Sequence, residues 1–162
     1  MEIKRIVVPT DFSEQSLKAL DYAIDFARSH EGAEIVILHV VEPIRHTRFI
    51  PDVSVFLEQQ RAEAADKIAA LEKRTRQRYG KCRSEVHFGT PYEAIIEAAE
   101  KLKADLIIIA THGHTGLAHL FLGSVAERVV RIAKCPVLTV HALNALLPRE
   151  RTRRPRRKRK GT

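Results

Sequence analysis

The chain has 162 residues, of which 44% are hydrophobic and 30% charged, so it is long enough for one domain that buries roughly two-thirds of its unfolded surface. Its formal net charge is +8, but nine of its 28 basic residues and one of its 20 acidic residues lie between Arg149 and Lys160, which leaves 19 of each sign elsewhere. A neutral body argues against a nucleic-acid-binding face on the domain. Because no apolar run approaches the ~20 residues of a membrane span and the N-terminus reads as a strand, we expect neither a membrane span nor a signal peptide.

The first half of the chain predicts strands that alternate with helices. Residues 3–8 are apolar and strand-like, and residues 13–30 carry apolar side chains at helical spacing. Residues 34–41 (EIVILHVV) form a continuous, β-branched apolar run, which indicates a strand buried on both faces, as in a parallel sheet. A long polar helix is expected over residues 52–79. Its expected core-facing residues are Phe56, Ala64, Ile68 and Leu71.

The second half continues the alternation. We expect strands at 84–88, 106–110 and 137–140 and helices at 90–103 and 123–133. The start of the first of these helices is clear, with Thr90 as cap, Pro91 at the first helical position and Glu93 three residues after the cap. Strict alternation with two-sided burial predicts an α/β fold, an open doubly wound five-stranded parallel sheet with helices on both faces.

The expected strand order is 3-2-1-4-5. In such a sheet, ligands bind beyond the carboxyl ends of the strands, at the point where the order reverses. That point would lie between the first strand, which ends in Pro9, Thr10 and Asp11, and the fourth, which ends in Ala110, Thr111, His112 and Gly113. These polar, turn-like strand ends would then face one crevice.

The stretch from Asp105 to Val130 predicts phosphate binding, because a strand leads through a glycine- and histidine-rich loop to a new helix at Gly123 and Ser124. Backbone N–H groups converge at such a helix N-terminus, and the helix dipole favours an anion. The loop is neither a Walker A motif nor the dinucleotide G-x-G-x-x-G. The alternative is a structural loop, in which Ser124 and Glu127 form an ordinary capping box.

Two further features near the crevice have competing interpretations. Asp11 or Ser13 would simply cap the first helix, or Asp11 would accept a hydrogen bond from a ribose hydroxyl or hold a metal. His112, His114 and His119 crowd one loop, with His39 on the second strand, but no cysteine or carboxylate lies nearby in sequence to complete a zinc site. We therefore expect no metal site, and instead a loop histidine that contacts a phosphate or ribose.

Cysteine usage and the C-terminus indicate the setting of the protein. Cys82 and Cys135 show no metal or redox spacing, which suggests a reducing cytoplasm. We expect a domain over residues 1–147 and a disordered basic tail over residues 148–162, because like charges repel and nothing apolar can pack. The tail from Arg149 to Lys160 is either a solvated extension or a binding segment for nucleic acid, an anionic membrane or an acidic protein partner.

Three segments together resemble the universal stress protein family. They are VVPTDFSEQSLKAL at the start, ILHVVEP on the second strand and ATHGHTGLAHLFLGSVAERVVRIAKCPVLTV near the end. The last segment is similar to the nucleotide-binding signature of the family, G-x2-G-x9-G-S/T. The resemblance covers residues 3–140 and points to the single-domain, nucleotide-binding branch, with its Rossmann-like fold.

The resemblance implies that ATP, or ADP or AMP, with or without Mg²⁺, binds in the crevice between the first and fourth strands. Pro9, Thr10 and Asp11 would line the adenosine, with Asp11 near the ribose, and Val40 would meet the adenine through its backbone. The residues that would follow the ribose and phosphates are Ile109, Ala110, His112, Gly113, Gly123, Ser124, Val125 and Ala126.

Two departures from the family pattern concern the phosphates. The first glycine of the signature is Ala110 here, and its extra methyl group could crowd a close approach of the ligand to the backbone. Many relatives carry Lys or Arg where this chain has His114. Because a neutral imidazole supplies less countercharge, phosphate binding would rest mostly on backbone N–H groups and the helix dipole, which makes AMP or ADP better candidates than in a relative with a cation there.

The expected function is that of a nucleotide-dependent stress-response regulator, a homodimer formed through Val137–Val140. No general base is placed for attack by water, so we expect no catalytic residues and no efficient catalysis; slow ATP hydrolysis or autophosphorylation stays open. One alternative is a nucleotide-free dimeric interaction protein. Another is an adaptor that binds nucleic acid or an anionic membrane through the basic tail.

Overall fold

A computed structural model describes residues 2–30, 32–43, 53–111 and 123–141. The elements, in chain order, are β1 (Arg5–Pro9), α1 (Glu14–Arg28), β2 (Glu34–Val41), α2 (Val53–Arg78), β3 (Cys82–Phe88), α3 (Pro91–Lys101), β4 (Leu106–Ala110), α4 (Ser124–Ile132) and β5 (Val137–Val140). The strands form a parallel five-stranded sheet in the order β3-β2-β1-β4-β5. The predicted fold class and strand order are therefore confirmed.

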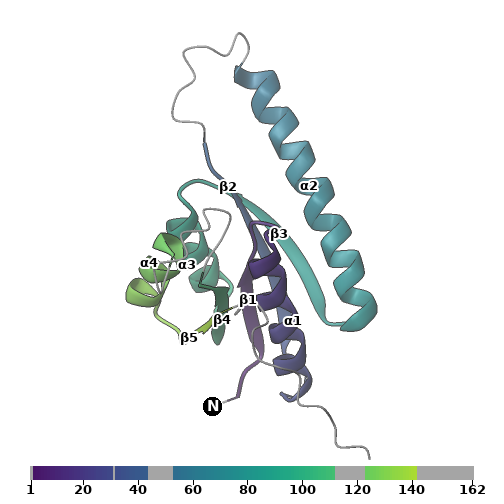
Figure 1. Cartoon of the computed structure of the whole chain (residues 1–162), viewed down its shortest axis with the longest axis vertical. Helices are drawn as coiled ribbons and strands as arrows, with labels where there is room; N and C mark the ends of the chain where they lie inside the picture. Colours follow the sequence, from purple (N-terminus) through teal and green to yellow (C-terminus); the bar gives the residue numbers. More distant parts are fainter. Residues whose placement is uncertain (1, 31, 44–52, 112–122, 142–162) are drawn as a thin grey trace, which may run out of the picture.

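Helices cover both faces of the sheet, with α1 and α2 on one face and α3 and α4 on the other (Figure 1). Successive side chains of a strand point to opposite faces, so one apolar strand supplies two cores. Ile35 and Ile37 of β2 pack toward α1 and α2, whereas Val36 and Leu38 pack toward α3 and α4, and all four are fully buried. This is why the sequence of β2 is continuously apolar.

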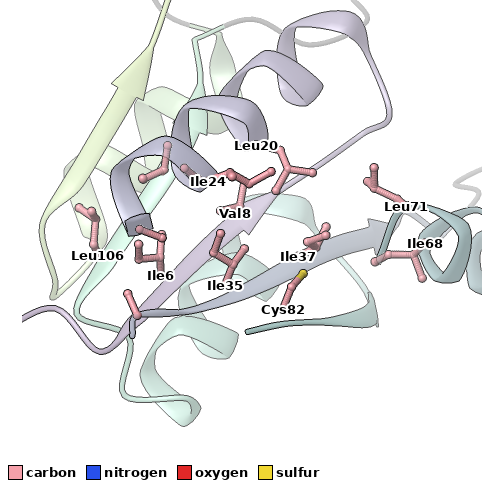
Figure 2. Close-up of a cluster of buried hydrophobic side chains, with 14 residues drawn as sticks. Ile6, Val8, Leu20, Ile24, Ile35, Ile37, Ile68, Leu71, Cys82 and Leu106 are labelled. Atoms are coloured by element: carbon pink, nitrogen blue, oxygen red, sulfur yellow. The ribbon is translucent and has the colours of Figure 1, made fainter. Parts of the chain in front are cut away.

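The core beneath α1 and α2 is built from side chains of the strands and of both helices. Figure 2 shows Ile6, Val8 and Ile35 on the strands lying against Leu20 and Ile24 of α1. Three of the four core-facing residues predicted on α2 are buried: Ala64, Ile68 and Leu71. Phe56, the fourth prediction, is only partly buried, because the N-terminal part of α2 runs past the end of the sheet (Figure 1).

Most helix bounds and those of β1 and β3 differ from the predicted ones by one or two residues, and three of these differences have a clear local reason. β1 begins at Arg5 rather than residue 3, because the backbone N–H groups of Lys4 and Arg5 donate to the Asp105 carboxylate (2.8 and 2.9 Å). β3 begins two residues early, since Cys82 pairs with Ile35 of β2. α3 ends at Lys101, and Lys103 beyond it takes the left-handed conformation (φ 51°), which stops a helix.

The start of α3 matches the expected positions but not the expected capping bonds. Thr90 is the N-cap and Pro91 the first helical residue, yet the side chain of Thr90 accepts no backbone N–H group of the helix. The Glu93 carboxylate instead accepts a hydrogen bond from the Tyr92 hydroxyl (2.7 Å). Within the described ranges, no helix is long and apolar enough to cross a membrane.

Candidate functional site

A cavity of about 370 Å³ lies at the carboxyl ends of β1 and β4, where the strand order reverses. Its lining includes ten residues predicted from the sequence: Pro9, Thr10, Asp11, Val40, Ile109, Ala110, Gly123, Ser124, Val125 and Ala126. The remaining three predicted residues, His112, Gly113 and His114, lie outside the described residues. The structure therefore brings together every predicted site residue that it describes.

The turn between β1 and α1 forms one wall of the cavity and is tightly bonded. Phe12 takes the left-handed conformation (φ 63°), and its N–H group donates to the Thr10 hydroxyl (3.0 Å). Ser13 is the N-cap of α1, with its side chain accepting from the N–H group of Ser16 (3.2 Å). The Asp11 carboxylate accepts from the N–H group of Ser13 (3.0 Å) rather than capping the helix itself, so Asp11 is held at the cavity wall.

His39 supports this turn from β2. Its Nδ1 lies 2.8 Å from the carbonyl oxygen of Thr10, and its ring centroid lies 4.5 Å from that of Phe12. Because a carbonyl oxygen only accepts, Nδ1 carries a proton in this hydrogen bond. The histidine thus helps to fix the backbone that carries Asp11, a role that the sequence did not indicate.

The N-terminus of α4 forms the opposite wall. Gly123 is the N-cap, in an extended conformation (φ −68°, ψ 153°), and as a glycine it has no side chain with which to cap the helix. Its own N–H group donates to the carbonyl oxygen of Thr111 at the end of β4 (2.5 Å), which ties the helix start to the strand. Ser124 is then the first helical residue, so it does not form a capping box with Glu127. The first N–H groups of α4 consequently lie at the cavity without a cap from their own N-cap residue, and a helix N-terminus of this kind favours an anion.

Six further residues line the cavity: Ser16, Leu38, Glu42, Pro91, Ile95 and Thr111. The sequence did not indicate the first five. Pro91 and Ile95 come from the first turns of α3, and nothing in the chain order shows that this helix start reaches the crevice. Thr111 was visible as part of the fourth strand end, and it is 5% exposed. Leu38 and Ile95 give the cavity an apolar side, as an aromatic base would require.

The described residues that line the cavity carry negative charge. Asp11 and Glu42 are the charged residues among those lining it, and the hydroxyl groups of Thr10, Ser16, Thr111 and Ser124 supply further polar atoms. Within the described residues, no cluster of three or more His, Cys, Asp or Glu side chains is arranged to hold a metal ion.

The two cysteines lie away from this cavity. Burial, followed by the nearby charge of Glu72, raises the pKa of Cys82 to about 12, and burial also raises the pKa of Cys135. Both thiols therefore stay protonated near neutral pH and are poor nucleophiles.

Comparison with known proteins gives a consistent result. The model of the universal stress protein family (Usp) matches residues 2–141. Universal stress protein MJ0531 of Methanocaldococcus jannaschii is 40% identical over 143 residues, which cover 85% of this chain and 81% of that protein.

Two solved structures share the fold. The structure of MJ0577, also from M. jannaschii, has a TM-score of 0.80 and 31% identity, covering 90% of this chain and 100% of that one. A universal stress protein solved in complex with cAMP has a TM-score of 0.63 and 28% identity, covering 87% of this chain and 99% of that one. The family match over almost the whole described chain, the similarity to MJ0531 and the shared fold show that this chain belongs to the universal stress protein family.

Proposed function

We propose that this protein binds an adenine nucleotide in the crevice between β1 and β4 and acts as a nucleotide-dependent regulator of a stress response. One observation carries the proposal. Asp11, which follows β1, and the N-terminus of α4, which follows β4, line the same cavity of about 370 Å³. The cAMP complex of a 28% identical universal stress protein supports it, because that protein holds an adenine nucleotide on the same fold.

The chemistry of the cavity fits the parts of a nucleotide. Its apolar side, with Leu38 and Ile95, suits the base, and the backbone of Val40 at the end of β2 would meet the base edge. Asp11 would accept from the ribose hydroxyls. The uncapped start of α4 at Gly123 and Ser124 would donate backbone N–H groups to phosphate oxygens. We propose ATP, ADP or AMP as ligand, with Mg²⁺ bound through the phosphates when ATP is present.

Ala110 stands at the position of the signature's first glycine, and it lines the cavity while being 8% exposed. Its methyl group narrows the crevice beside β4. The cavity of about 370 Å³ is the space that remains with this methyl group in place, so the proposal does not require a glycine at this position.

We propose a regulatory role rather than efficient catalysis. Asp11, one of the two carboxylates at the cavity, accepts hydrogen bonds from the backbone and side chain of Ser13, and this lowers its availability as a general base for water. Slow hydrolysis or autophosphorylation stays open. The regulatory signal would pass through a homodimer formed by Val137–Val140 in β5.

Two alternatives follow from the sequence. A nucleotide-free dimeric interaction protein would use the same dimer surface and leave the crevice without a role. The basic segment from Arg149 to Lys160 would bind nucleic acid or an acidic partner, and this can accompany nucleotide binding, because the segment lies beyond the last strand of the fold.

The first experiment is to denature the purified protein and identify released small molecules by chromatography and mass spectrometry. We expect an adenine nucleotide in near-stoichiometric amount, or, from an empty preparation, binding of added ATP with Mg²⁺ by calorimetry. A protein that releases nothing and binds neither ATP, ADP nor AMP would overturn the proposal in favour of the nucleotide-free interaction protein.

The placement of the phosphates is tested with Gly123→Val. The φ of −68° at Gly123 suits any residue, so the variant should fold, while its side chain blocks the approach of phosphate to the start of α4. We expect nucleotide binding to be lost. Gly80→Val is the matched control, because a Cβ atom at Gly80 meets no atom within 4 Å, and it should bind as the wild type does. Unchanged affinity in a folded Gly123→Val variant would contradict the placement.

A further inference from the structure

A second cavity, of about 220 Å³, adjoins the crevice between the starts of α3 and α4. The two cavities share four lining residues: Glu42, Pro91, Ser124 and Val125. The second cavity, called the side lobe below, therefore lies next to the crevice at the start of α4. A ligand with its phosphate at Ser124 would reach the side lobe without crossing the protein.

Arg128 of α4 lines the side lobe and is held there by an aromatic ring. Its guanidinium carbon lies 4.7 Å from the centroid of the Tyr92 ring on α3. The Tyr92 hydroxyl donates to Glu93 (2.7 Å), and this hydrogen bond fixes the ring. A guanidinium stacked by its face directs its N–H groups along its own plane. One of them interacts with the Tyr92 hydroxyl, and the rest of the fork matches the oxygens of a phosphate.

Charge distinguishes Arg128 from the other residues at both cavities. The described lining of the crevice and the side lobe contains the carboxylates of Asp11 and Glu42, and among these lining residues Arg128 is the cation. Arg128 already interacts with the charge of Glu93 and with the Tyr92 hydroxyl, both at the start of α3, whereas Arg131 pairs with Glu127 (3.7 Å). A polyphosphate beside two carboxylates requires a positive charge, and Arg128 supplies it within one helical turn of Ser124.

We propose that the side lobe receives the outer phosphates of the nucleotide and that Arg128 is the residue that favours di- and triphosphates over the monophosphate. The inference rests on the proposed nucleotide site. Tyr92 acts as a positioning residue, which holds the guanidinium over the lobe. Arg128 on α4 would thus supply the positive charge that many relatives place at the position of His114.

The test measures dissociation constants for ATP, ADP, AMP and adenosine with the wild-type protein and three variants, by calorimetry at low salt. Arg128→Ala should weaken ATP and ADP about tenfold, the usual worth of one charged hydrogen bond, and leave adenosine unchanged and AMP little changed. Arg128→Lys should recover part of the loss, because it keeps the charge without the planar fork. Arg131→Ala removes the same charge one turn further along α4, outside the lobe, and should leave all four constants unchanged.

Four results decide between the hypotheses. A loss confined to ATP and ADP in Arg128→Ala, absent from Arg131→Ala, supports the inference. Equal weakening of all four ligands, or no weakening, overturns it and leaves the nucleotide site intact. Equal effects of Arg128→Ala and Arg131→Ala also overturn it, because the loss of one positive charge anywhere on α4 would then explain the weaker binding. A wild-type protein that binds none of the four overturns the proposed function itself.

Discussion

At the scale of single residues, the chain places paired charges where the sheet is not covered by helices. Glu34 at the start of β2 accepts hydrogen bonds from Arg5 Nε on β1 (2.9 Å) and from Arg83 Nε on β3 (3.1 Å). The three side chains are each about one-third exposed. Partial burial alone would raise the pKa of Glu34, but the hydrogen bonds and charges of the two arginines outweigh it and hold this pKa below its ordinary value of 4.5. The carboxylate therefore links three neighbouring strands.

The lowered pKa of Glu34 fixes the sign of a pH effect. A carboxyl group whose pKa is depressed by folding stabilises the protein above its unfolded pKa, and this stabilisation is lost as the pH falls through the folded value. We expect Glu34→Gln to lower the free energy of unfolding by about 0.5–1 kcal/mol at pH 7, the range of partly exposed ion pairs. At a pH well below 4.5, wild type and variant should be equally stable. Urea denaturation at both pH values measures this.

Glu2→Gln provides the comparison for Glu34. Glu2 forms an ion pair with Lys4 (3.1 Å), but its side chain is 76% exposed, so its loss should change stability little at either pH. An equal effect of the two substitutions, or a Glu34→Gln deficit that persists unchanged at low pH, would contradict the role given to the carboxylate.

At the scale of elements, the start of α1 links helix stability to the site. The hydroxyl group of Ser13 accepts from the N–H group of Ser16 as the helix cap, and it also donates to the Asp11 carboxylate (2.5 Å). One side chain thus ends the turn after β1, begins α1 and orients the carboxylate proposed to meet the ribose. Ser13 is 6% exposed, so water does not readily replace these bonds.

We expect Ser13→Ala to lower the free energy of unfolding by about 1 kcal/mol, the usual worth of a serine N-cap. The variant should also bind adenosine more weakly, because the Asp11 carboxylate loses a donor that orients it. Thermal unfolding and calorimetry check the two effects. Ser29→Ala, at the exposed far end of α1, should change neither quantity. A variant that is less stable but binds adenosine normally would show that Ser13 stabilises α1 without orienting Asp11 for the ligand.

The sequence predicted elements well where the signal is local. β2, β4 and β5 have their predicted bounds, because continuous β-branched runs end at charged or turn residues. The capping interactions were predicted less well. Thr90 and Ser124 both stand in sequence patterns typical of capping boxes, yet neither forms one. In α4 the hydrogen bond from Gly123 to Thr111, the residue after β4, moves the helix start by one residue, and this tertiary contact is not visible in the local pattern.

At the scale of the whole molecule, β5 is an edge strand of the sheet. The backbone N–H groups of Ile107 on β4 and of Thr111 just after it donate to the carbonyl oxygens of Pro136 and Val140. The polar backbone groups of Thr139, which alternates with these positions, therefore face the open edge. Such an edge is suited to pairing with a second chain. This is consistent with the proposed homodimer through Val137–Val140.

We expect Thr139→Pro to convert the proposed dimer to a monomer. Proline removes the N–H group that faces the partner and leaves the bonds to β4 in place, as at other sheet edges. Sedimentation velocity measures the change, and circular dichroism checks the fold. Thr139→Val keeps the N–H group and should remain dimeric. A folded Thr139→Pro protein that sediments with the wild-type dimer, or a monomeric wild type, would contradict this interface.

The sequence by itself determined the order of strands and helices, the two-sided burial of the sheet and ten residues of the cavity wall. The order and the burial depend on periodicity, which a single chain displays directly. The cavity residues depend on short motifs around Asp11 and Gly123 and on the resemblance to the universal stress protein family. Only the tertiary structure decided that the start of α3 reaches the crevice, that His39 supports the turn after β1, and that Arg128 stacks on Tyr92 in a side lobe. The physical reason is that each of these contacts joins elements far apart in the chain, and their alignment depends on how helices pack on the sheet rather than on any local pattern.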